Sequence, residues 1–210
     1  LLNESVKKIA IGASFNCAIT NADRVKCWGS NSLGQLGYGD TTDRGITEAD
    51  MNSLPYVNLG LDGSNQPLKS REIYIGAGGD SLCSIFMDYR VKCWGKNDLG
   101  QLGNGTITNR GSQASHMGNN LPYLKNVNNI DLVGAYLRTS GDEDFCLRSN
   151  VDTKVYCWGN NQFSAVSPIF PNTPSVPREY LVNPGDTAPF LVAGSQIAKT
   201  FTTNQEQSKT

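Results

Sequence analysis

The chain has 210 residues, of which 38% are hydrophobic and 18% are charged, a length that allows one large domain or two small ones. Lys and Arg total 18 and Asp and Glu total 19, for a net charge of -1, which excludes a chain-wide attraction to nucleic acid or to an anionic membrane. No apolar run reaches the ~18 residues that a membrane-spanning helix needs.

The first predicted element is a strand in "KKIAIGA", whose apolar residues alternate from Lys7 onward. The segments "CAI" and "RVKCW" that follow it also have strand patterns, and no ten-residue window shows a convincing helical period. The same succession then returns. Residues 15–29, "FNCAITNADRVKCWG", align with residues 81–95, "SLCSIFMDYRVKCWG", and with residues 144–159, "DFCLRSNVDTKVYCWG".

The repeat extends beyond the strands into glycine-rich loops and a longer insertion. "CWGSNSLGQLGYGD" at residues 27–40 matches "CWGKNDLGQLGNGT" at residues 93–106, and "MNSLPYV" matches "MGNNLPYL". Because the insertion is itself repeated, we expect it to fold the same way each time, on one side of the stack. We predict a single repeat domain, 1–210, with a degenerate, truncated last unit; the units are 1–65, 66–129, 130–187 and 188–210.

Six cysteines form three close pairs, each of which brackets a turn-like segment between two expected strands. Opposed residues of an antiparallel pair have Cβ atoms ~4.5–5.5 Å apart, which a disulfide can bridge after small adjustment. Free thiols and a metal site are the alternatives, although zinc sites usually need closer cysteines or neighbouring histidines. Disulfides indicate an oxidising environment; the expected bridges join Cys17 to Cys27, Cys83 to Cys93 and Cys146 to Cys157.

Short strands, frequent turns and a long period predict an all-β fold, a β-propeller-like radial repeat of about three and a half blades. We expect a partial propeller or part of a larger or oligomeric one, because an open arc exposes apolar faces. Glycine permits close backbone approach in the "LGQLG" loops, and tryptophan beside a disulfide suits the core between blades. Structural roles are therefore predicted for Trp28, Gly34, Gly37, Trp94, Gly100, Gly103 and Trp158.

The pattern "VKCWG-x-N-x-x-GQLG-x-G", which occurs twice, resembles the repeat of the regulator of chromosome condensation family. The disulfide-stapled "CWG" form resembles the secreted bacterial members of that family. The resemblance implies a β-propeller, usually of seven blades. It also implies two activities to weigh, nucleotide exchange on a small GTPase and inhibition of a secreted enzyme.

Candidate binding residues come from the loops and insertions, because aromatic and Arg side chains dominate binding hot spots. The alternative for the "LPY" tyrosines is packing on their own blade. No catalytic set is visible, because His116 lacks a nucleophile nearby in the sequence, and the acidic run 142–144 indicates a solvated turn or a weak cation site. We expect no enzyme activity, no cofactor and no metal; the candidate binding residues are Tyr38, Arg44, Tyr56, Arg110 and Tyr123.

We therefore expect a non-enzymatic recognition module of a secreted or cell-surface protein, an adhesin-like tip that binds protein or carbohydrate on another cell. The alternative is a secreted protein inhibitor of an extracellular enzyme, whereas disulfides and balanced charge disfavour GTPase exchange. The first residue, Leu1, indicates a processed product or a fragment. We also expect an extracellular, cell-surface or periplasmic location, no nucleic-acid partner, no membrane insertion, and a homo-oligomer such as a trimer.

Overall fold

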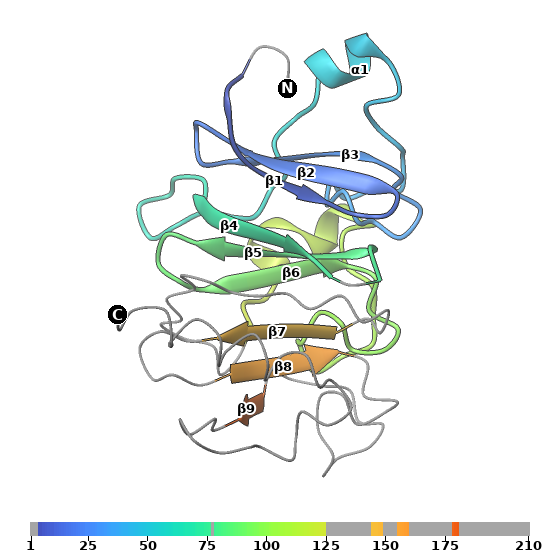
Figure 1. Ribbon diagram of the computed structural model, residues 1–210. Coiled ribbons are helices and arrows are strands. Elements are labelled where there is room, and N and C mark those ends of the chain that lie inside the picture. The colour runs from blue at the N-terminus through green and yellow to red at the C-terminus, as the bar shows by residue number, and fades with distance from the viewer. Residues whose placement is uncertain (1–3, 77, 125–143, 149–154, 160–177, 181–210) are drawn as a thin grey trace, which may run out of the picture.

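Three antiparallel sheets lie one above another in the computed structural model, which describes residues 4–76, 78–124, 144–148, 155–159 and 178–180 (Figure 1). Each sheet has three strands within these residues, hydrogen-bonded in sequence order. We call each sheet, with the loops that follow it, a blade. Blade 1 contains β1 (Val6–Ile11), β2 (Phe15–Thr20) and β3 (Val25–Gly29); blade 2 contains β4 (Ser70–Ile75), β5 (Ser81–Phe86) and β6 (Val91–Gly95); blade 3 contains β7 (Asp144–Arg148), β8 (Val155–Gly159) and β9 (Arg178–Tyr180).

The hairpin at the centre of each blade sets the register of its cysteines. In blade 1 the tight turn places Asp23 at a φ of 59°, and blade 2 places Tyr89 at 64°. These turns bring the paired cysteines of each blade directly opposite each other, with 4.1 Å between their Cα atoms. The structure has both bridges, Cys17–Cys27 and Cys83–Cys93.

The third predicted bridge falls partly outside the described residues. The backbone register of β7 and β8 places Cys146 opposite Cys157, as in the first two blades. The side chains of this pair are not described, so their disulfide stays a prediction. The predicted unit 188–210 also lies outside the described residues.

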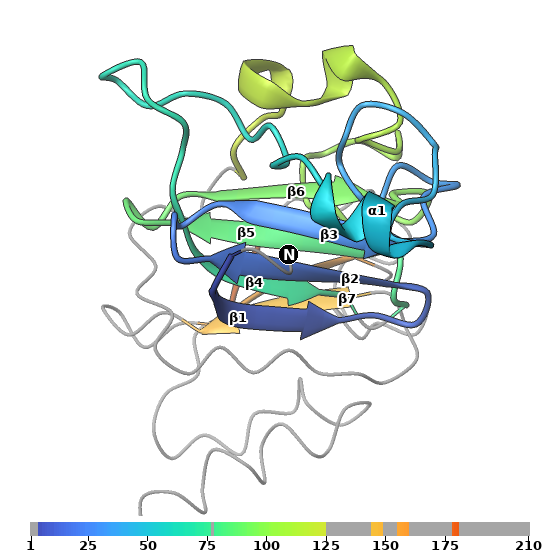
Figure 2. The ribbon, with the colours of Figure 1, turned by 90° about the horizontal axis from the view of Figure 1, so that it is seen from above.

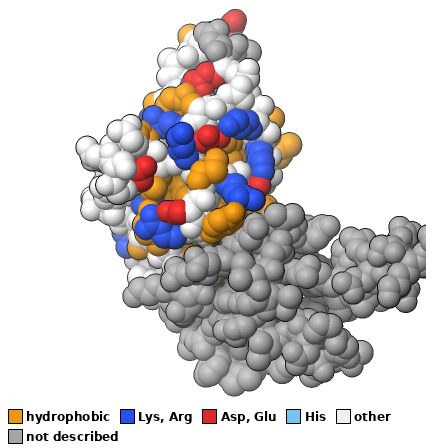
Figure 3. All heavy atoms as spheres, turned by 90° about the vertical axis from the view of Figure 1, so that its left-hand side faces the viewer, with side chains coloured by type: hydrophobic (Ala, Val, Ile, Leu, Met, Phe, Trp, Pro, Cys, Tyr) orange, Lys and Arg blue, Asp and Glu red, His pale blue; other side chains and the backbone are white. Residues whose placement is uncertain are grey.

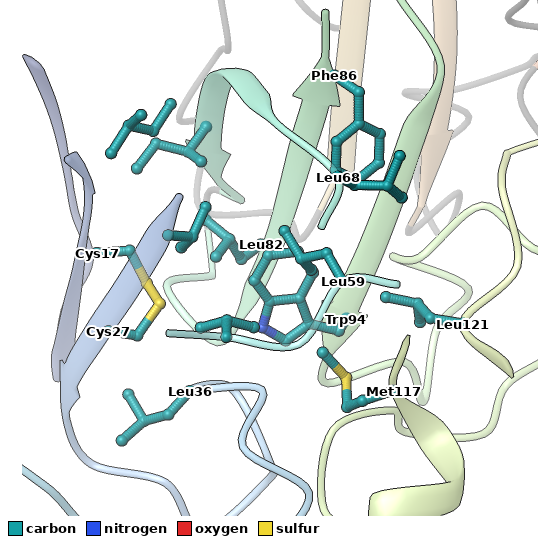
Figure 4. Packing of buried hydrophobic residues seen from close by; sticks show 14 of the residues in the cluster. Cys17, Cys27, Leu36, Leu59, Leu68, Leu82, Phe86, Trp94, Met117 and Leu121 are labelled. Carbon is teal, nitrogen blue, oxygen red and sulfur yellow. A yellow bond between two sulfur atoms is a disulfide. The ribbon is translucent and has the colours of Figure 1, made fainter. Parts of the chain in front are cut away.

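A shared hydrophobic core joins blades 1 and 2 (Figure 4). The disulfide and Leu36 of blade 1 lie on one side of this core, and Trp94 of blade 2 lies near its centre. Leu59, from the insertion of blade 1, also packs into it. Stacking therefore buries sheet faces that a single blade would leave in water.

One contact recurs at both described blade junctions. The indole N–H of Trp94 donates to the carbonyl oxygen of Gln35 in the preceding blade, at 3.1 Å. In the same way, Trp158 donates to Gln101, at 2.9 Å. Both indoles are fully buried, with 0% of their surface exposed. At both junctions the tryptophan of one blade thus packs against the glycine-rich loop of the preceding blade.

Trp28 departs from the prediction that all three tryptophans lie between blades. Its side chain is only partly buried, and its Cβ packs close to Gly45 of its own blade. The physical reason lies in its position, which is that of Trp94, since Trp28 is opposite Asn16 as Trp94 is opposite Leu82. This places Trp28 on the outward face of blade 1, and no described blade lies above that sheet (Figure 1). Ile9 on the same face is 59% exposed, whereas its counterpart Ile73 in blade 2 is 6% exposed.

The repeated insertions lie on one side of the stack, beyond β3 and β6 (Figure 2). Their local structures differ, contrary to the expectation that both fold the same way. Blade 1 has a five-residue helix, α1 (Glu48–Asn52), which begins with a capping box between Thr47 and Asp50. Blade 2 has two 3₁₀ turns instead, η1 (Ala114–His116) and η2 (Gly118–Asn120). None of the helices among the described residues is long and apolar enough to span a membrane.

Candidate functional site

The loop that follows β3 is closed by its own side chains. Arg44 makes a two-pronged contact with the carboxylate of Asp40, at 2.9 and 2.7 Å, and its guanidinium lies 4.4 Å from the centroid of the Tyr38 ring. The hydrogen bonds from Arg44 hold the pKa of Asp40 below its ordinary value. The Tyr38 hydroxyl accepts a bond from the Cys27 amide, and burial raises the pKa of Tyr38 to about 12.

The equivalent loop of blade 2 lacks both partners of its arginine. Arg110 occupies the position of Arg44, but Asn104 replaces Tyr38 and Thr106 replaces Asp40. The Nε of Arg110 is buried without a hydrogen-bond partner, and among the described residues its guanidinium has no carboxylate partner. An unpaired, partly buried cation is unfavourable unless something pairs with it.

Two neighbours add to the character of this loop. His116 lies close to Arg110, and its Nδ1 is also buried without a partner. Burial, and next the charge of Arg110, lower the pKa of His116 below its ordinary value, so the imidazole favours its neutral form. Ile107, three residues before Arg110, is 58% exposed. Blade 2 thus presents an apolar side chain and an unpaired cation on one loop.

The two "LPY" tyrosines are held by their own blades. The Tyr56 ring has the Arg24 guanidinium 4.2 Å from its centroid, and its hydroxyl donates to Glu4 at 2.8 Å. The Tyr123 ring has the Arg90 guanidinium at 4.0 Å. This arrangement matches the packing alternative, and a binding role for these rings stays a prediction.

Backbone pairing explains why the insertions dock in this way. The amide of Val57 donates to Val25 of β3, and the amide of Leu124 donates to Val91 of β6, both at 2.8 Å. Each "LPY" segment therefore runs beside the outer strand of its sheet. This position brings its tyrosine over the Lys of that strand and over the Arg just before the strand.

Two hollows among the described residues have few charged side chains. An open groove of about 450 Å³ lies between β1 and β4, and its charged side chains, Lys8 and Glu72, form an ion pair. A pocket of about 160 Å³ beside the blade 1 insertion has Arg24 as its charged member. Across the described residues, no three His, Cys, Asp or Glu side chains gather as metal ligands.

The surface carries mixed charge. Figure 3 shows basic, acidic and apolar side chains interspersed over one face of the described blades. Several of the charges are paired, as in Lys7 with Asp23 and Arg90 with Asp88. Such a face lacks the single-sign potential that steers nucleic acids.

Comparisons with known proteins agree with this geometry. The model of the family described as "Regulator of chromosome condensation (RCC1) repeat" matches residues 6–35. The chain is 28% identical to the Ultraviolet-B receptor UVR8 of Arabidopsis thaliana over 155 residues, which are 73% of this chain and 29% of the receptor. The chain thus spans less than a third of that relative.

Solved structures show the fold. Yeast RCC1 (Prp20), in a complex with Kap60, matches 89% of this chain and 39% of its own, with 16% identity and a TM-score of 0.57. Human WBSCR16 matches 85% and 40%, with 21% identity and a TM-score of 0.56. The stacked sheets therefore have the fold of a β-propeller. The repeat unit resembles that of the regulator of chromosome condensation family, whose model matches residues 6–35, and the two described bridges give it a disulfide-stapled form.

The sequence predicts the same binding role for Arg44 and Arg110, but in the structure the two side chains differ in their partners. One is paired inside its loop and the other is not. The signal was present in the aligned repeats, where Asp40 corresponds to Thr106 and Tyr38 to Asn104. The unpaired arginine of blade 2 is therefore visible in the positions at which the two repeats differ, and not in the motif that they share.

Proposed function

We propose that the chain is a non-catalytic protein-recognition module of a secreted or cell-surface protein, with an adhesin-like role. One observation carries the proposal: the blade 2 loop presents exposed Ile107 and unpaired Arg110. Arginine is enriched in protein-binding hot spots, and an exposed aliphatic side chain beside it adds apolar surface for a partner to bury. The matching blade 1 loop has Thr41 in place of Ile107 and is closed by its own ion pair.

The same chemistry favours protein over carbohydrate as the partner. A protein typically binds a sugar by packing an aromatic side chain against the apolar face of the sugar ring. The faces of Tyr38, Tyr56 and Tyr123 already have cations against them. The two disulfides support a location outside reducing compartments, because such bridges persist only in oxidising surroundings.

Binding of the labelled chain to a panel of intact bacterial and animal cells tests the proposal. We expect saturable binding that protease treatment of the cells removes and glycosidase treatment leaves intact. Ile107→Asp should weaken binding at least about tenfold, since loss of one hot-spot side chain costs over ~1.4 kcal/mol. Thr41→Asp, at the equivalent position of blade 1, is the matched control and should bind as the parent does.

Three results would count against the proposal. Binding that glycosidase abolishes and protease spares would assign a carbohydrate partner. Equal loss in both variants would place the contact elsewhere. Absence of binding to every cell type would remove the adhesin-like role.

A further inference from the structure

We propose that Arg110 binds a carboxylate from another molecule, at the position that the Asp40 carboxylate occupies in blade 1, and that this carboxylate is an acidic side chain of a partner protein. The carboxylate chemistry follows from a comparison of the two blades. The assignment to a protein side chain rests on the proposed function. The two parts are therefore tested separately.

Blade 1 shows what a filled site looks like. The Asp40 carboxylate accepts both prongs of Arg44 at 2.9 and 2.7 Å. It also accepts hydrogen bonds from the backbone amide of Thr42, at 2.9 Å, and from the side-chain amide of Asn31, at 3.1 Å. Two-pronged Arg–carboxylate pairs are among the strongest hydrogen-bonded contacts in proteins.

Blade 2 keeps the frame around this position. Gly95 and Arg110 exchange backbone hydrogen bonds of 2.7 and 3.0 Å, as Gly29 and Arg44 do at 2.7 and 3.1 Å. The side-chain oxygen of Asn97 accepts from the Leu102 amide at 2.8 Å. The equivalent bond in blade 1, to Asn31, is 2.9 Å. The two arginines therefore leave the backbone at matching places in matching loops.

The acidic groups of this frame are lost in blade 2, together with the tyrosine ring that packs on Arg44 in blade 1. Segment 40–45, "DTTDRG", has two Asp and one Arg, which sum to -1, whereas segment 106–111, "TITNRG", has one Arg and sums to +1. Thr106 stands in place of Asp40, and Asn109 in place of Asp43. Asn109 still makes the structural bond to the Asn97 amide, at 2.8 Å. Blade 2 has thus lost the two carboxylates and kept the backbone frame. Its arginine is left without a carboxylate partner in the described part of the chain.

Two buried nitrogen atoms and one backbone amide near this place have no partner among the described residues. The Nε of Arg110 and the Nδ1 of His116 are both buried and unpaired. Most buried polar atoms in native structures are satisfied, by protein groups, by ordered water or by a bound group, so an unpaired one calls for an explanation. The nearby amide of Thr108 corresponds to the Thr42 amide that binds Asp40, and among the described residues it has no acceptor.

An acetate titration of the ¹⁵N-labelled full chain, at constant ionic strength held with chloride, tests the carboxylate chemistry. The readout is the Nε–H resonance of Arg110, identified by its disappearance in Arg110→Lys. We expect a saturable shift with a half-point on the order of 100 mM, as for one partly exposed ion pair. The absence of a saturable shift would overturn the proposal.

Two substitutions that swap the equivalent residues of the two blades supply matched controls. Thr106→Asp places the carboxylate within the chain, as in blade 1, and should abolish the acetate response of Arg110. Asp40→Thr opens the blade 1 site and should give Arg44 the response that it lacks in the parent. An acetate shift of Arg110 that persists in Thr106→Asp would contradict the proposed position.

Short capped peptides separate a protein side chain from a free acid. Gly-Asp-Gly should shift the Arg110 resonance in the parent and not in Thr106→Asp, whereas Gly-Asn-Gly should have no effect. A response to acetate without a response to Gly-Asp-Gly would refute the protein side chain as ligand. The cell-binding result for Ile107→Asp does not bear on this titration, so the proposed function and this site can fail independently.

Discussion

Lys26 and Lys92 occupy equivalent positions in consecutive blades, and their surroundings differ in charge. Lys26 forms an ion pair with Glu4, at 2.7 Å. Lys92 is 2% exposed, and its amine donates to the carbonyl oxygens of Leu59 and Gly118, at 2.8 and 3.0 Å. Burial, and next the charge of Arg90, lower the pKa of Lys92 to about 8. The junction between the insertions is thus held by a lysine whose amine contacts two carbonyl oxygens and lies 4.6 Å from the centroid of the Tyr123 ring.

This lysine should make stability depend on pH. The unfolded chain holds the lysine proton up to an ordinary pKa of 10.5, whereas the folded chain releases it near 8. Between these values the unfolded state binds more protons, so the free energy of unfolding should rise with pH. We expect the parent to gain up to about 2 kcal/mol over Lys92→Met between pH 8 and 9.5, since one pKa unit corresponds to 1.36 kcal/mol.

Urea unfolding at each pH, followed by circular dichroism, measures this difference. The comparison with Lys92→Met cancels groups that titrate in both proteins. Lys26→Met serves as a control, because Lys26 has a carboxylate partner and lies at the other end of the pair of blades. A parent curve that runs parallel to that of Lys92→Met would show that the lysine stays charged in the folded chain.

At the scale of the element, the strands and their cysteine register were predictable from sequence, and the insertions were not. Three copies of one strand pattern and the spacing from Cys17 to Cys27 defined the hairpins. Helix α1 has five residues, too few for a helical period. Its capping sequence was the one local signal for it. The partner of Tyr56 is Glu4, 52 residues away, and such contacts depend on tertiary packing alone.

The glycine-rich loop is the element on which blade stacking depends. Gly37 has a φ of 73°, and a Cβ there would lie 2.6 Å from the Trp94 Nε1. Gly37→Ala should therefore strain the backbone and displace the tryptophan. We expect a loss of about 2–4 kcal/mol in the free energy of unfolding, from left-handed backbone strain and overpacking together.

Gly63→Ala is the matched control, because a Cβ at Gly63 meets nothing within 4 Å. It should lie within about 0.5 kcal/mol of the parent or be slightly more stable. Chemical denaturation measures both variants. If Gly37→Ala proves as stable as Gly63→Ala, then the loop yields easily and does not fix the junction.

At the scale of the whole molecule, the outward face of blade 1 is more polar than the equivalent face of blade 2. Asn16 stands where blade 2 has Leu82, and Thr20 where it has Phe86. Lys26 and Glu4 pair over the same face. A polar outer face of this kind keeps a repeat soluble where no neighbouring blade covers it. Ile9 and Ile11 on β1 are apolar and exposed on this face. The homo-oligomer stays a prediction, and these two side chains are its candidate contact.

The shared core of blades 1 and 2 predicts that these blades open together. One hydrophobic cluster contains the Cys17–Cys27 bridge and Trp94, so neither sheet can expose this face while the other keeps it buried. Trp94→Ala should cost about 3–5 kcal/mol, as for a fully buried aromatic residue. Hydrogen exchange should show an equal loss of protection at the amides of β2 and β5, because both depend on the same opening. Trp28→Ala, at the equivalent but partly exposed position, should cost less. Loss of protection confined to β5 would instead mean that each blade unfolds alone, and that the tryptophan contact aligns the sheets without coupling their stability.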